Sequence, residues 1–455
     1  MSDLDKIFKA YDIRGVVPDE LDEDVAEAVG AAFVKLTNAR QIVTLHDMRT
    51  SSEPLAAAIA RGAVSQGASV IAGGLGSTDM VYYASGFLDV PGIMVTASHN
   101  PARYNGLKLC KAGAKPVGIE TGLAEIKQYV IDGVPADNSK TPGTVTDKDL
   151  LPGYAEYLKK LVDISGIRPL KVVVDAGNGM AGHTVPTVFK GLPIDLVPLY
   201  FELDGTFPNH EANPIEPENL RDLQKAVKEH QADIGLAFDG DADRCFVVDE
   251  KGEIVSPSVL TALIATRELK REPGATVIHN LITSRAVPEI ITEHGGTPVR
   301  TRVGHSFIKA KMAETKAIFG GEHSGHFYFR DFWFADSGML AALHTLAALG
   351  TDTRPLSEIL AEYSRYVATG EINSEVADQA AVTAKVKDRY AGRPGVRIDE
   401  LDGLTVAADN WWFNLRPSNT EPLLRFNAEA PTTAETAALR DEVLGVVRGT
   451  TDRSE

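Results

Sequence analysis

The chain has 455 residues, a formal net charge of −17, two cysteines and no long run of Lys or Arg. At roughly 100–200 residues per domain this length predicts three or four domains, and the acidic charge argues against nucleic-acid and anionic-membrane partners. Two cysteines offer no disulfide framework or metal-ligand spacing, and no segment reaches the ~20 apolar residues that span a bilayer, so we expect a soluble, cytoplasmic protein.

One pattern occurs three times along the chain. A short apolar strand at residues 41–45, 171–174 and 275–278 is followed by a polar turn and a helical pattern. Each repeat then continues with an apolar strand, a polar loop and another apolar strand, as expected of diverged βαβ-containing units. We expect domains at residues 1–150, 151–252 and 253–366, and a smaller α+β domain at 367–455.

The first polar loop carries Ser98, between the apolar run 92–95 and Pro101. Proline lacks an N–H and has a fixed φ, so the backbone should turn at this serine and expose its hydroxyl. Ser, Asn and Pro also form ordinary polar turns, so this loop alone does not establish phosphotransfer chemistry.

The second polar loop contains Asp239, Asp241 and Asp243, which alternate with small residues. Three carboxylates so close repel one another unless a hard cation lies between them, and Mg²⁺ suits a few protein oxygens with positions left for water or phosphate. An EF-hand would place glycine where Arg244 stands and helices where apolar strand-like runs flank the loop. A solvated acidic turn is the remaining alternative.

Two later loops complete the set. The third, at residues 320–326, is rich in glycine and histidine and lies between aromatic strand-like runs. The fourth, at 416–422, combines a guanidinium with two hydroxyls, as a phosphate clamp requires, although a capped turn would look similar.

Five motifs occur in an order that points to one family: FKAYDIRG (8–15), TASHNP (96–101), DGDADR (239–244), GEHSGH (321–326) and RPSNTEP (416–422). Together they resemble the α-D-phosphohexomutase family over the whole chain, and most of all its phosphomannomutases and phosphomannomutase/phosphoglucomutases. The resemblance implies an α/β fold with three related α/β domains with mixed sheets and a C-terminal α+β domain, arranged around a central active-site cleft.

The resemblance also implies residue roles. Ser98 would be the phosphoserine, and one Mg²⁺ would be held by an oxygen of its phosphoryl group and by Asp239, Asp241 and Asp243. The implied catalytic cations are Arg14, Lys108 and Arg244, and the general base stays open among His99, Lys108 and Arg14. The implied substrate contacts are Tyr11, His305, Glu322, Ser324 and His326, with Arg416, Ser418, Asn419 and Thr420 for the non-reacting phosphate.

The implied reaction interconverts mannose 6-phosphate and mannose 1-phosphate through a hexose 1,6-bisphosphate, which is also the activator. Phosphoglucomutase and phosphoglucosamine mutase activities are alternatives. The family's phosphoglucosamine mutases usually have glutamine and glycine where this chain has His323 and Asn419, which favours a hexose without a 2-amino group. Hexose phosphates are the expected partners, and the chain could be a monomer or a homodimer.

Two departures and two other classes of protein complete this interpretation. Asp79 stands where many members have proline, and Ala242 where many have glycine, so we expect a negative φ at Ala242. A metal-dependent sugar phosphatase would have little need of the fourth loop. A non-catalytic sugar-phosphate sensor would have no need of Ser98 and the three aspartates.

Overall fold

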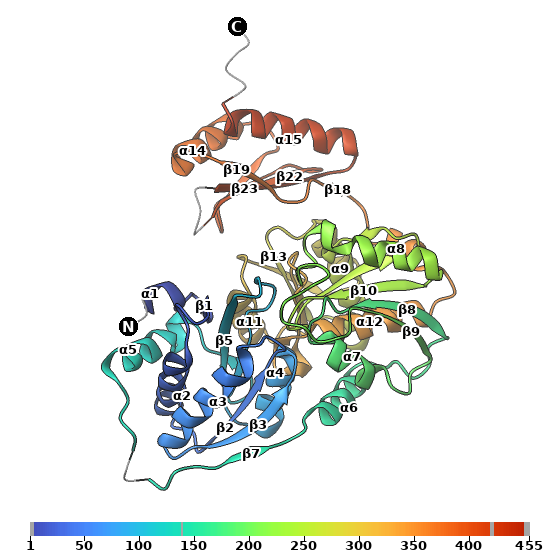
Figure 1. The fold of residues 1–455 in the computed structure, drawn as a ribbon. Coiled ribbons are helices and arrows are strands. Elements are labelled where there is room, and N and C mark those ends of the chain that lie inside the picture. The colour runs from blue at the N-terminus through green and yellow to red at the C-terminus, as the bar shows by residue number, and fades with distance from the viewer. Residues whose placement is uncertain (1–3, 138–139, 419–422, 450–455) are drawn as a thin grey trace.

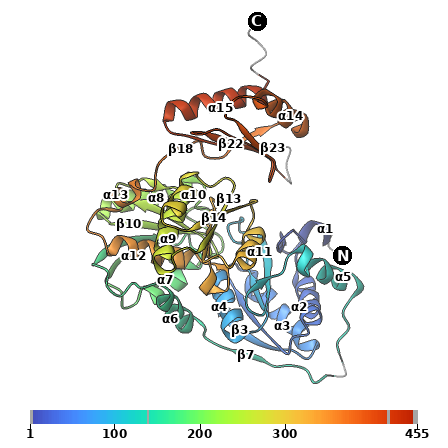
Figure 2. The same cartoon turned by 180° about the vertical axis from the view of Figure 1, so that it is seen from behind.

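A computed structural model describes residues 4–137, 140–418 and 423–449 of the chain. It contains four β-sheets, each with its own helices (Figure 1). The first three units lie side by side, and the fourth stands at one end, next to the third, in both opposite views (Figures 1 and 2). Among the described residues, no helix has the length and apolarity needed to cross a membrane.

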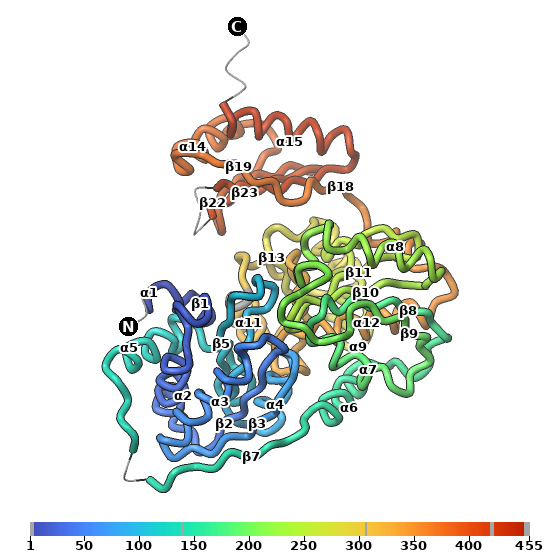
Figure 3. Tube along the Cα trace, in the orientation of Figure 1, coloured from blue at the N-terminus to red at the C-terminus, as the bar shows by residue number. Residues whose placement is uncertain are grey.

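The first sheet has seven strands, six of them in the order β1-β5-β4-β2-β3-β7, and the short strand β6 pairs with β5. Its strands are β1 (Ile13–Val16), β2 (Gln41–His46), β3 (Ser69–Leu75), β4 (Gly92–Val95), β5 (Tyr104–Lys111), β6 (Lys115–Pro116) and β7 (Val145–Asp147). Its helices are α1 (Leu4–Ile7), α2 (Glu23–Thr37), α3 (Ser52–Ser65), α4 (Thr78–Leu88) and α5 (Leu123–Asp132). The tube in Figure 3 shows β7 running along the outer edge toward the second unit.

The second and third sheets have five strands each and the same design. The second follows the order β12-β11-β10-β8-β9 and the third β14-β13-β15-β16-β17. Second-unit elements are α6 (Leu151–Leu161), β8 (Leu170–Asp175), α7 (Ala181–Phe189), β9 (Ile194–Leu199), α8 (Arg221–His230), β10 (Ile234–Phe238), β11 (Cys245–Asp249) and β12 (Ile254–Val255). Third-unit elements are α9 (Pro257–Arg271), β13 (Thr276–Asn280), α10 (Ala286–Glu293), β14 (Thr297–Thr301), α11 (His305–Thr315), β15 (Phe319–Gly321), β16 (Phe327–Phe329), β17 (Ala335–Asp336), α12 (Gly338–Gly350) and α13 (Leu356–Ala361).

The three polar loops occupy the same place in these three sheets. Each joins the last strand of a parallel group to an antiparallel neighbour: β4 to β5, β10 to β11, and β15 to β16. The expected repeat is therefore confirmed as a structural one, with β2, β8 and β13 as the leading strands and α3, α7 and α10 after them. Mixed sheets of this kind confirm the predicted fold class.

The fourth unit is an antiparallel sheet covered on one face by two helices. Its strands are β18 (Val367–Ala368), β19 (Ile372–Glu375), β20 (Arg397–Asp399), β21 (Leu404–Ala407), β22 (Trp412–Pro417) and β23 (Leu423–Ala430). The helices α14 (Gln379–Tyr390) and α15 (Thr433–Val447) begin at the capping side chains of Asp378 and Thr432. They lie on the face turned away from the other units (Figure 1) and enclose a separate apolar core.

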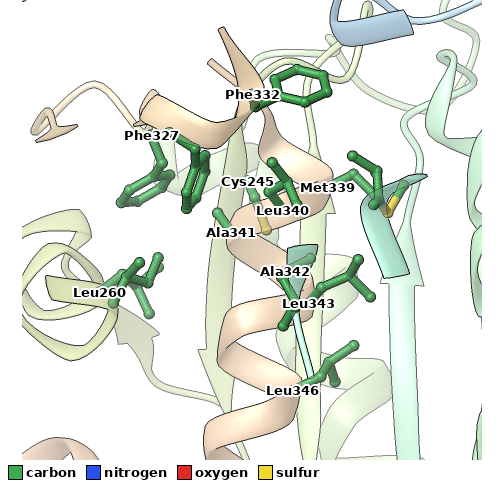
Figure 4. Packing of buried hydrophobic residues seen from close by; sticks show 14 of the residues in the cluster. Cys245, Leu260, Phe327, Phe332, Met339, Leu340, Ala341, Ala342, Leu343 and Leu346 are labelled. Carbon is green, nitrogen blue, oxygen red and sulfur yellow. The ribbon is translucent and has the colours of Figure 1, made fainter. Parts of the chain in front are cut away.

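A single apolar core joins the first three units, and α12 lies at its centre. Almost every residue of this helix is buried, and Figure 4 shows its leucines and alanines among side chains of neighbouring elements, including Leu260 of α9 and Cys245 of β11. Both Cys245 and Cys110 are buried free thiols, as expected. Ser337 begins the helix by accepting a hydrogen bond from the Leu340 N–H at 3.0 Å.

The first residue of α12 sets how closely the helix approaches the second polar loop. A Cβ added to Gly338 would lie 2.7 Å from the carbonyl carbon of Arg244. We expect Gly338→Ala to lower the free energy of unfolding by about 1–3 kcal/mol, because backbone must shift to admit the methyl group. Chemical denaturation measures this, with Gly166→Ala as control, since a Cβ there meets nothing within 4 Å. Equal stability of the two variants would contradict the expectation.

Candidate active site

Ser98 is buried, and its hydroxyl meets the second polar loop. Ser98 Oγ donates to Asp239 Oδ2 at 2.8 Å, and His99 Nδ1 lies 3.3 Å from Ser98 Oγ. Only 4% of the residue is exposed, so the expectation of an exposed hydroxyl is wrong. The second unit covers the hydroxyl through Asp239. The backbone at Ser98 is left-handed, with φ of +50°.

The three aspartates of the second loop converge as predicted. Asp239, Asp241 and Asp243 are at most 1% exposed, and one oxygen of each lies within 4.8 Å of the others. The Oδ1 atoms of Asp241 and Asp243 are buried without a hydrogen-bond partner among the described residues. Unpartnered buried carboxylate oxygens are costly, and hard cations take such oxygens as ligands. The donor set therefore fits a divalent metal ion.

Two cations share the remaining oxygens of this trio. Lys108 Nζ donates to Asp241 Oδ2 at 2.7 Å and to Asp243 Oδ2 at 2.6 Å, and Arg244 Nε donates to Asp239 Oδ2 at 2.9 Å. Burial alone would lower the pKa of Lys108, but the two carboxylates outweigh it and raise that pKa. Burial also raises the pKa of Asp239, whereas the ion pair with Lys108 overcomes burial and lowers the pKa of Asp241.

The departures at Ala242 and Asp79 have different outcomes. Ala242 has φ of +58°, so the expectation of a negative φ is wrong, and this loop holds an alanine in a conformation that favours glycine. Asp79 is fully buried and accepts hydrogen bonds from Tyr154 at 2.7 Å, from Ser337 at 2.6 Å and from Ser77. It thereby ties α4 to α6 and α12. Burial raises the pKa of Asp79 to about 6.

Arg14 and His99 flank the Ser98 turn. Arg14, on β1, donates to Asn100 Oδ1 at 2.7 Å and pairs with Asp12. The His99 ring is largely buried and lies near Arg244 and Arg14, and burial together with these cations lowers its pKa to about 2. The His99 side chain is therefore uncharged at neutral pH.

The third loop lies against the second. His326 Nε2 is 3.7 Å from Asp243 Oδ1, and its Nδ1 shares a hydrogen bond with Ser324 Oγ at 2.9 Å. Glu322 is 2% exposed and accepts from the Tyr328 hydroxyl at 2.6 Å and from the Gly304 N–H at 3.3 Å. The structure thus places His326 beside Asp243, and Ser324 and Glu322 beside His326.

The fourth loop approaches this site through the third unit. Arg416 lies near the end of β22, 3.8 Å from Asp402, and Asp402 also accepts a hydrogen bond from the Val303 N–H at 3.1 Å. Ser418 follows, whereas Asn419 and Thr420 lie outside the described residues. His305 begins α11 directly after Gly304. Tyr11 lies just before β1, in the same segment as Arg14.

Three residues near these loops were not predicted from the sequence. Thr78 donates to Asp241, Tyr328 holds Glu322, and Arg49 contacts the backbone around Ser98. Tyr328 and Thr78 sit in strand and helix patterns that look purely structural. Arg49 lies in the polar turn that follows the apolar strand at residues 41–45, the first strand of the repeat pattern.

The chain segment between β9 and α8, which contains His210 and Ala212, packs against the second loop. His210 Nε2 lies 3.0 Å from Asp175 Oδ2, and Nδ1 lies 2.8 Å from the Glu211 carbonyl oxygen, so both ring nitrogens face acceptors. Burial lowers the pKa of His210, but Asp175 outweighs it and the pKa is raised above the usual value of 6.5. Nearby, a Cβ on Gly240 would lie 3.6 Å from the Ala212 Cβ.

The stabilising effect of His210 is expected to depend on pH. Because its folded-state pKa is raised, this contribution is complete below the unfolded pKa of 6.5 and is lost as the pH rises through the folded value. His210→Gln should therefore lower the free energy of unfolding by about 1 kcal/mol more at pH 6 than at pH 9. Urea unfolding of both proteins at the two pH values measures this, and an equal loss at both would contradict it.

Comparison with known proteins places this arrangement in a family. Four profiles described as phosphoglucomutase/phosphomannomutase match in order: alpha/beta/alpha domains I, II and III at residues 5–133, 152–252 and 256–366, and the C-terminal domain at 371–446. A phosphomannomutase of Escherichia coli is 40% identical over 452 residues, which cover 97% of this chain and 99% of the relative. Phosphohexose mutases of Xanthomonas campestris pv. campestris are 41% identical over 447 residues, with the same coverage.

A crystal structure agrees with these sequence relationships. A phosphoglucomutase/phosphomannomutase family protein from Burkholderia thailandensis superposes with a TM-score of 0.88 at 34% identity, covering 100% of this chain and 99% of that one. Sequence profiles, full-length relatives and fold all agree with the five motifs and with the convergence of their loops. The chain therefore belongs to the phosphoglucomutase/phosphomannomutase family, the phosphohexomutase isomerases.

Proposed function

We propose that this enzyme is a phosphomannomutase that carries the transferred phosphoryl group on Ser98. The observation that supports this most directly is the 2.8 Å hydrogen bond between Ser98 Oγ and Asp239, within a buried trio of carboxylates and beside Lys108 and Arg244. A buried serine with carboxylates and cations around it suits phosphoryl transfer, which depends on positioning and charge neutralisation.

The acidic trio is proposed to hold one Mg²⁺ together with an oxygen of the Ser98 phosphoryl group. When bound, this ion would neutralise charge on the transferring phosphoryl group. Lys108, Arg244 and Arg14 would supply further positive charge around it.

The reaction has two halves with the same chemistry. In the first, a hydroxyl oxygen of the hexose phosphate bonds to the phosphorus of phosphoserine, the bond from phosphorus to Ser98 Oγ breaks, and the hydroxyl proton ends on Ser98. The resulting hexose 1,6-bisphosphate turns end for end. In the second half its other phosphoryl group returns to Ser98, so that the substrate is isomerised and no water is consumed.

Substrate binding is divided between the third and fourth loops in this proposal. Glu322 and Ser324 would bind the hydroxyls between the two ends of the sugar, with His326, His305 and Tyr11 as further contacts. Arg416, Ser418, Asn419 and Thr420 would bind whichever phosphate is not reacting. The partners of Arg416, Asp402 and Glu371, stand 3.8 and 3.9 Å away, which leaves its charge incompletely paired for an anion.

The choice of mannose rests on the relatives named phosphomannomutase at about 40% identity. It is tested by giving the purified enzyme mannose 1-phosphate, glucose 1-phosphate or glucosamine 1-phosphate, each with Mg²⁺ and a trace of hexose 1,6-bisphosphate. We expect fastest formation of the 6-phosphate from mannose 1-phosphate and almost no free phosphate. Faster turnover of glucose or glucosamine 1-phosphate would overturn the substrate assignment, and stoichiometric phosphate release would overturn the mutase mechanism.

A further inference from the structure

Arg49 is a buried cation to which the proposed reaction gives no role. It lies between β2 and α3, is 3% exposed, and uses all five N–H groups of its guanidinium within the first unit. Nε donates to Asp47 Oδ2 at 3.2 Å. The four remaining N–H groups donate to backbone carbonyls of one short segment: Ser98 and Asn100 at 2.9 and 2.7 Å, and Pro101 and Tyr104 at 2.9 Å each.

The same network also holds the N–H of Ser98. The Ser98 N–H donates to Thr96 Oγ1 at 2.9 Å, and Thr96 Oγ1 donates to Asp47 Oδ2 at 2.7 Å. Asp47, which is fully buried, also accepts from Ser52 Oγ and from the Arg49 N–H. Both backbone polar groups of Ser98 are therefore tied to the pair of Asp47 and Arg49.

This network explains how Ser98 keeps an unfavourable backbone conformation. A left-handed φ costs a residue with a side chain roughly 1–2 kcal/mol, and such strain persists only where the surroundings hold it. Here the Arg49 guanidinium bridges the Ser98 carbonyl and the carbonyls that follow. A free loop would relax to a negative φ, which would turn Oγ away from Asp239.

The guanidinium also lies where the second unit docks. The ring of Phe207 covers it, with 5.1 Å between the guanidinium carbon and the ring centroid. A Cβ on Gly205 would be 2.6 Å from the Arg49 Cα, and one on Gly240, in the aspartate loop, would be 2.4 Å from the Ser98 carbonyl oxygen. That oxygen is the one that Arg49 binds, so one residue fixes both the turn and the surface against which the aspartate loop rests.

We infer that Arg49 is a positioning residue for phosphoryl transfer: it locks Ser98 in the left-handed conformation that aims Oγ at the aspartates. The inference rests on the proposed role of Ser98. This positioning role requires the fork geometry of arginine and not its charge alone, because a planar guanidinium can bridge four carbonyls on one turn and a lysine ammonium cannot.

The test compares Arg49→Lys and Arg49→Ala with Arg61→Ala, an exposed arginine of α3 that pairs with Glu23 and Glu27. Both Arg49 variants should lose about 100-fold in kcat, with KM within about twofold of wild type, because the proposed sugar and phosphate contacts lie in other units. Arg61→Ala should match wild type. Loss of folded protein would also lower the apparent kcat at unchanged KM, so kcat is calculated per folded enzyme, with the folded fraction measured by urea unfolding. Arg49→Lys activity near wild type would overturn the inference.

A second pair of variants avoids removing the guanidinium. Thr96→Val deletes the hydroxyl that holds the Ser98 N–H but keeps the shape of the side chain, and Thr96→Ser restores the hydroxyl. We expect Thr96→Val to reproduce the loss of kcat at unchanged KM and Thr96→Ser to recover most of it. The inference would be contradicted if the two single variants, Thr96→Val and Arg49→Ala, were both folded and both had the wild-type kcat.

Intact mass after incubation with hexose 1,6-bisphosphate separates this inference from the proposed function. If wild type gains no phosphoryl group at Ser98, the proposed function fails. If wild type is phosphorylated and the Arg49 variants pass their phosphoryl group to hexose phosphate at the wild-type rate, only the inference about Arg49 fails.

Discussion

Replacement of Ser98 by alanine is expected to lower kcat at least about 10⁴-fold, the largest effect of any single change in this enzyme. The variant lacks the oxygen that would carry the phosphoryl group, and no other hydroxyl is hydrogen-bonded to Asp239 among the described residues. The free energy of unfolding should fall by only about 1 kcal/mol, because Asp239 keeps its contact with Arg244. A coupled assay for hexose 6-phosphate measures the first effect and urea unfolding the second.

Phosphorylation itself supplies the decisive comparison. After incubation with hexose 1,6-bisphosphate, the wild-type mass should rise by one phosphoryl group and that of Ser98→Ala should not. Ser357→Ala serves as the matched control, because it removes a serine hydroxyl that is hydrogen-bonded to Glu250, outside the site. More than a tenth of wild-type turnover in the Ser98 variant would rule out the phosphoserine role.

Replacement of Asp241 by asparagine is expected to have the second largest effect. Asp241 receives hydrogen bonds from Lys108 and Thr78 on one oxygen, while its other oxygen is buried without a hydrogen-bond partner among the described residues. Removing this charge should weaken Mg²⁺ binding and lower kcat by about 10³-fold. Without metal, the variant should be about as stable as wild type, because weaker repulsion among the carboxylates offsets the lost ion pair.

Thermal unfolding with and without metal isolates the binding effect. Mg²⁺ at about 100 times its Kd should stabilise wild type by about 2.7 kcal/mol, and a chelator should reverse this. The variant should show almost no stabilisation at the same concentration. Asp195→Asn, at an exposed carboxylate on β9 of the same unit, should respond like wild type. A full Mg²⁺ response in Asp241→Asn would exclude this residue as a ligand.

Local patterns in the sequence were sufficient to find loops that meet in the candidate active site. Alternating carboxylates between two continuous apolar runs predicted a metal site on a strand–loop–strand unit, and β10 and β11 confirm the strands that exclude an EF-hand. The sequence patterns of residues 378–389 and 433–447 are also typical of helices, and α14 and α15 form there, within one residue at each end. Such features depend on contacts between near neighbours in the chain, which a single sequence displays.

Conformation and burial within the loops could not be predicted in this way. Ser98 appeared exposed because its own turn leaves it open, yet a loop 141 residues away covers it. Ala242 was expected at negative φ from its intrinsic preference, but packing holds it at +58°. Both errors have one cause: contacts with residues distant in the chain bury the Ser98 hydroxyl and can hold a left-handed conformation that costs roughly 1–2 kcal/mol.

Ser98 and the three aspartates could be proposed as site residues from the sequence alone, and the strands that flank them could be predicted, because these features depend on a few neighbouring residues. The repeat in the sequence predicts three strand–loop–strand units, but only the strand pairing of the tertiary structure shows that β4, β10 and β15 each end at the same place in a mixed sheet. Arg49 is likewise a residue whose role only the tertiary structure shows. Its importance lies in four carbonyls 49 to 55 residues away, and hydrogen bonds to backbone leave no signature in side-chain sequence.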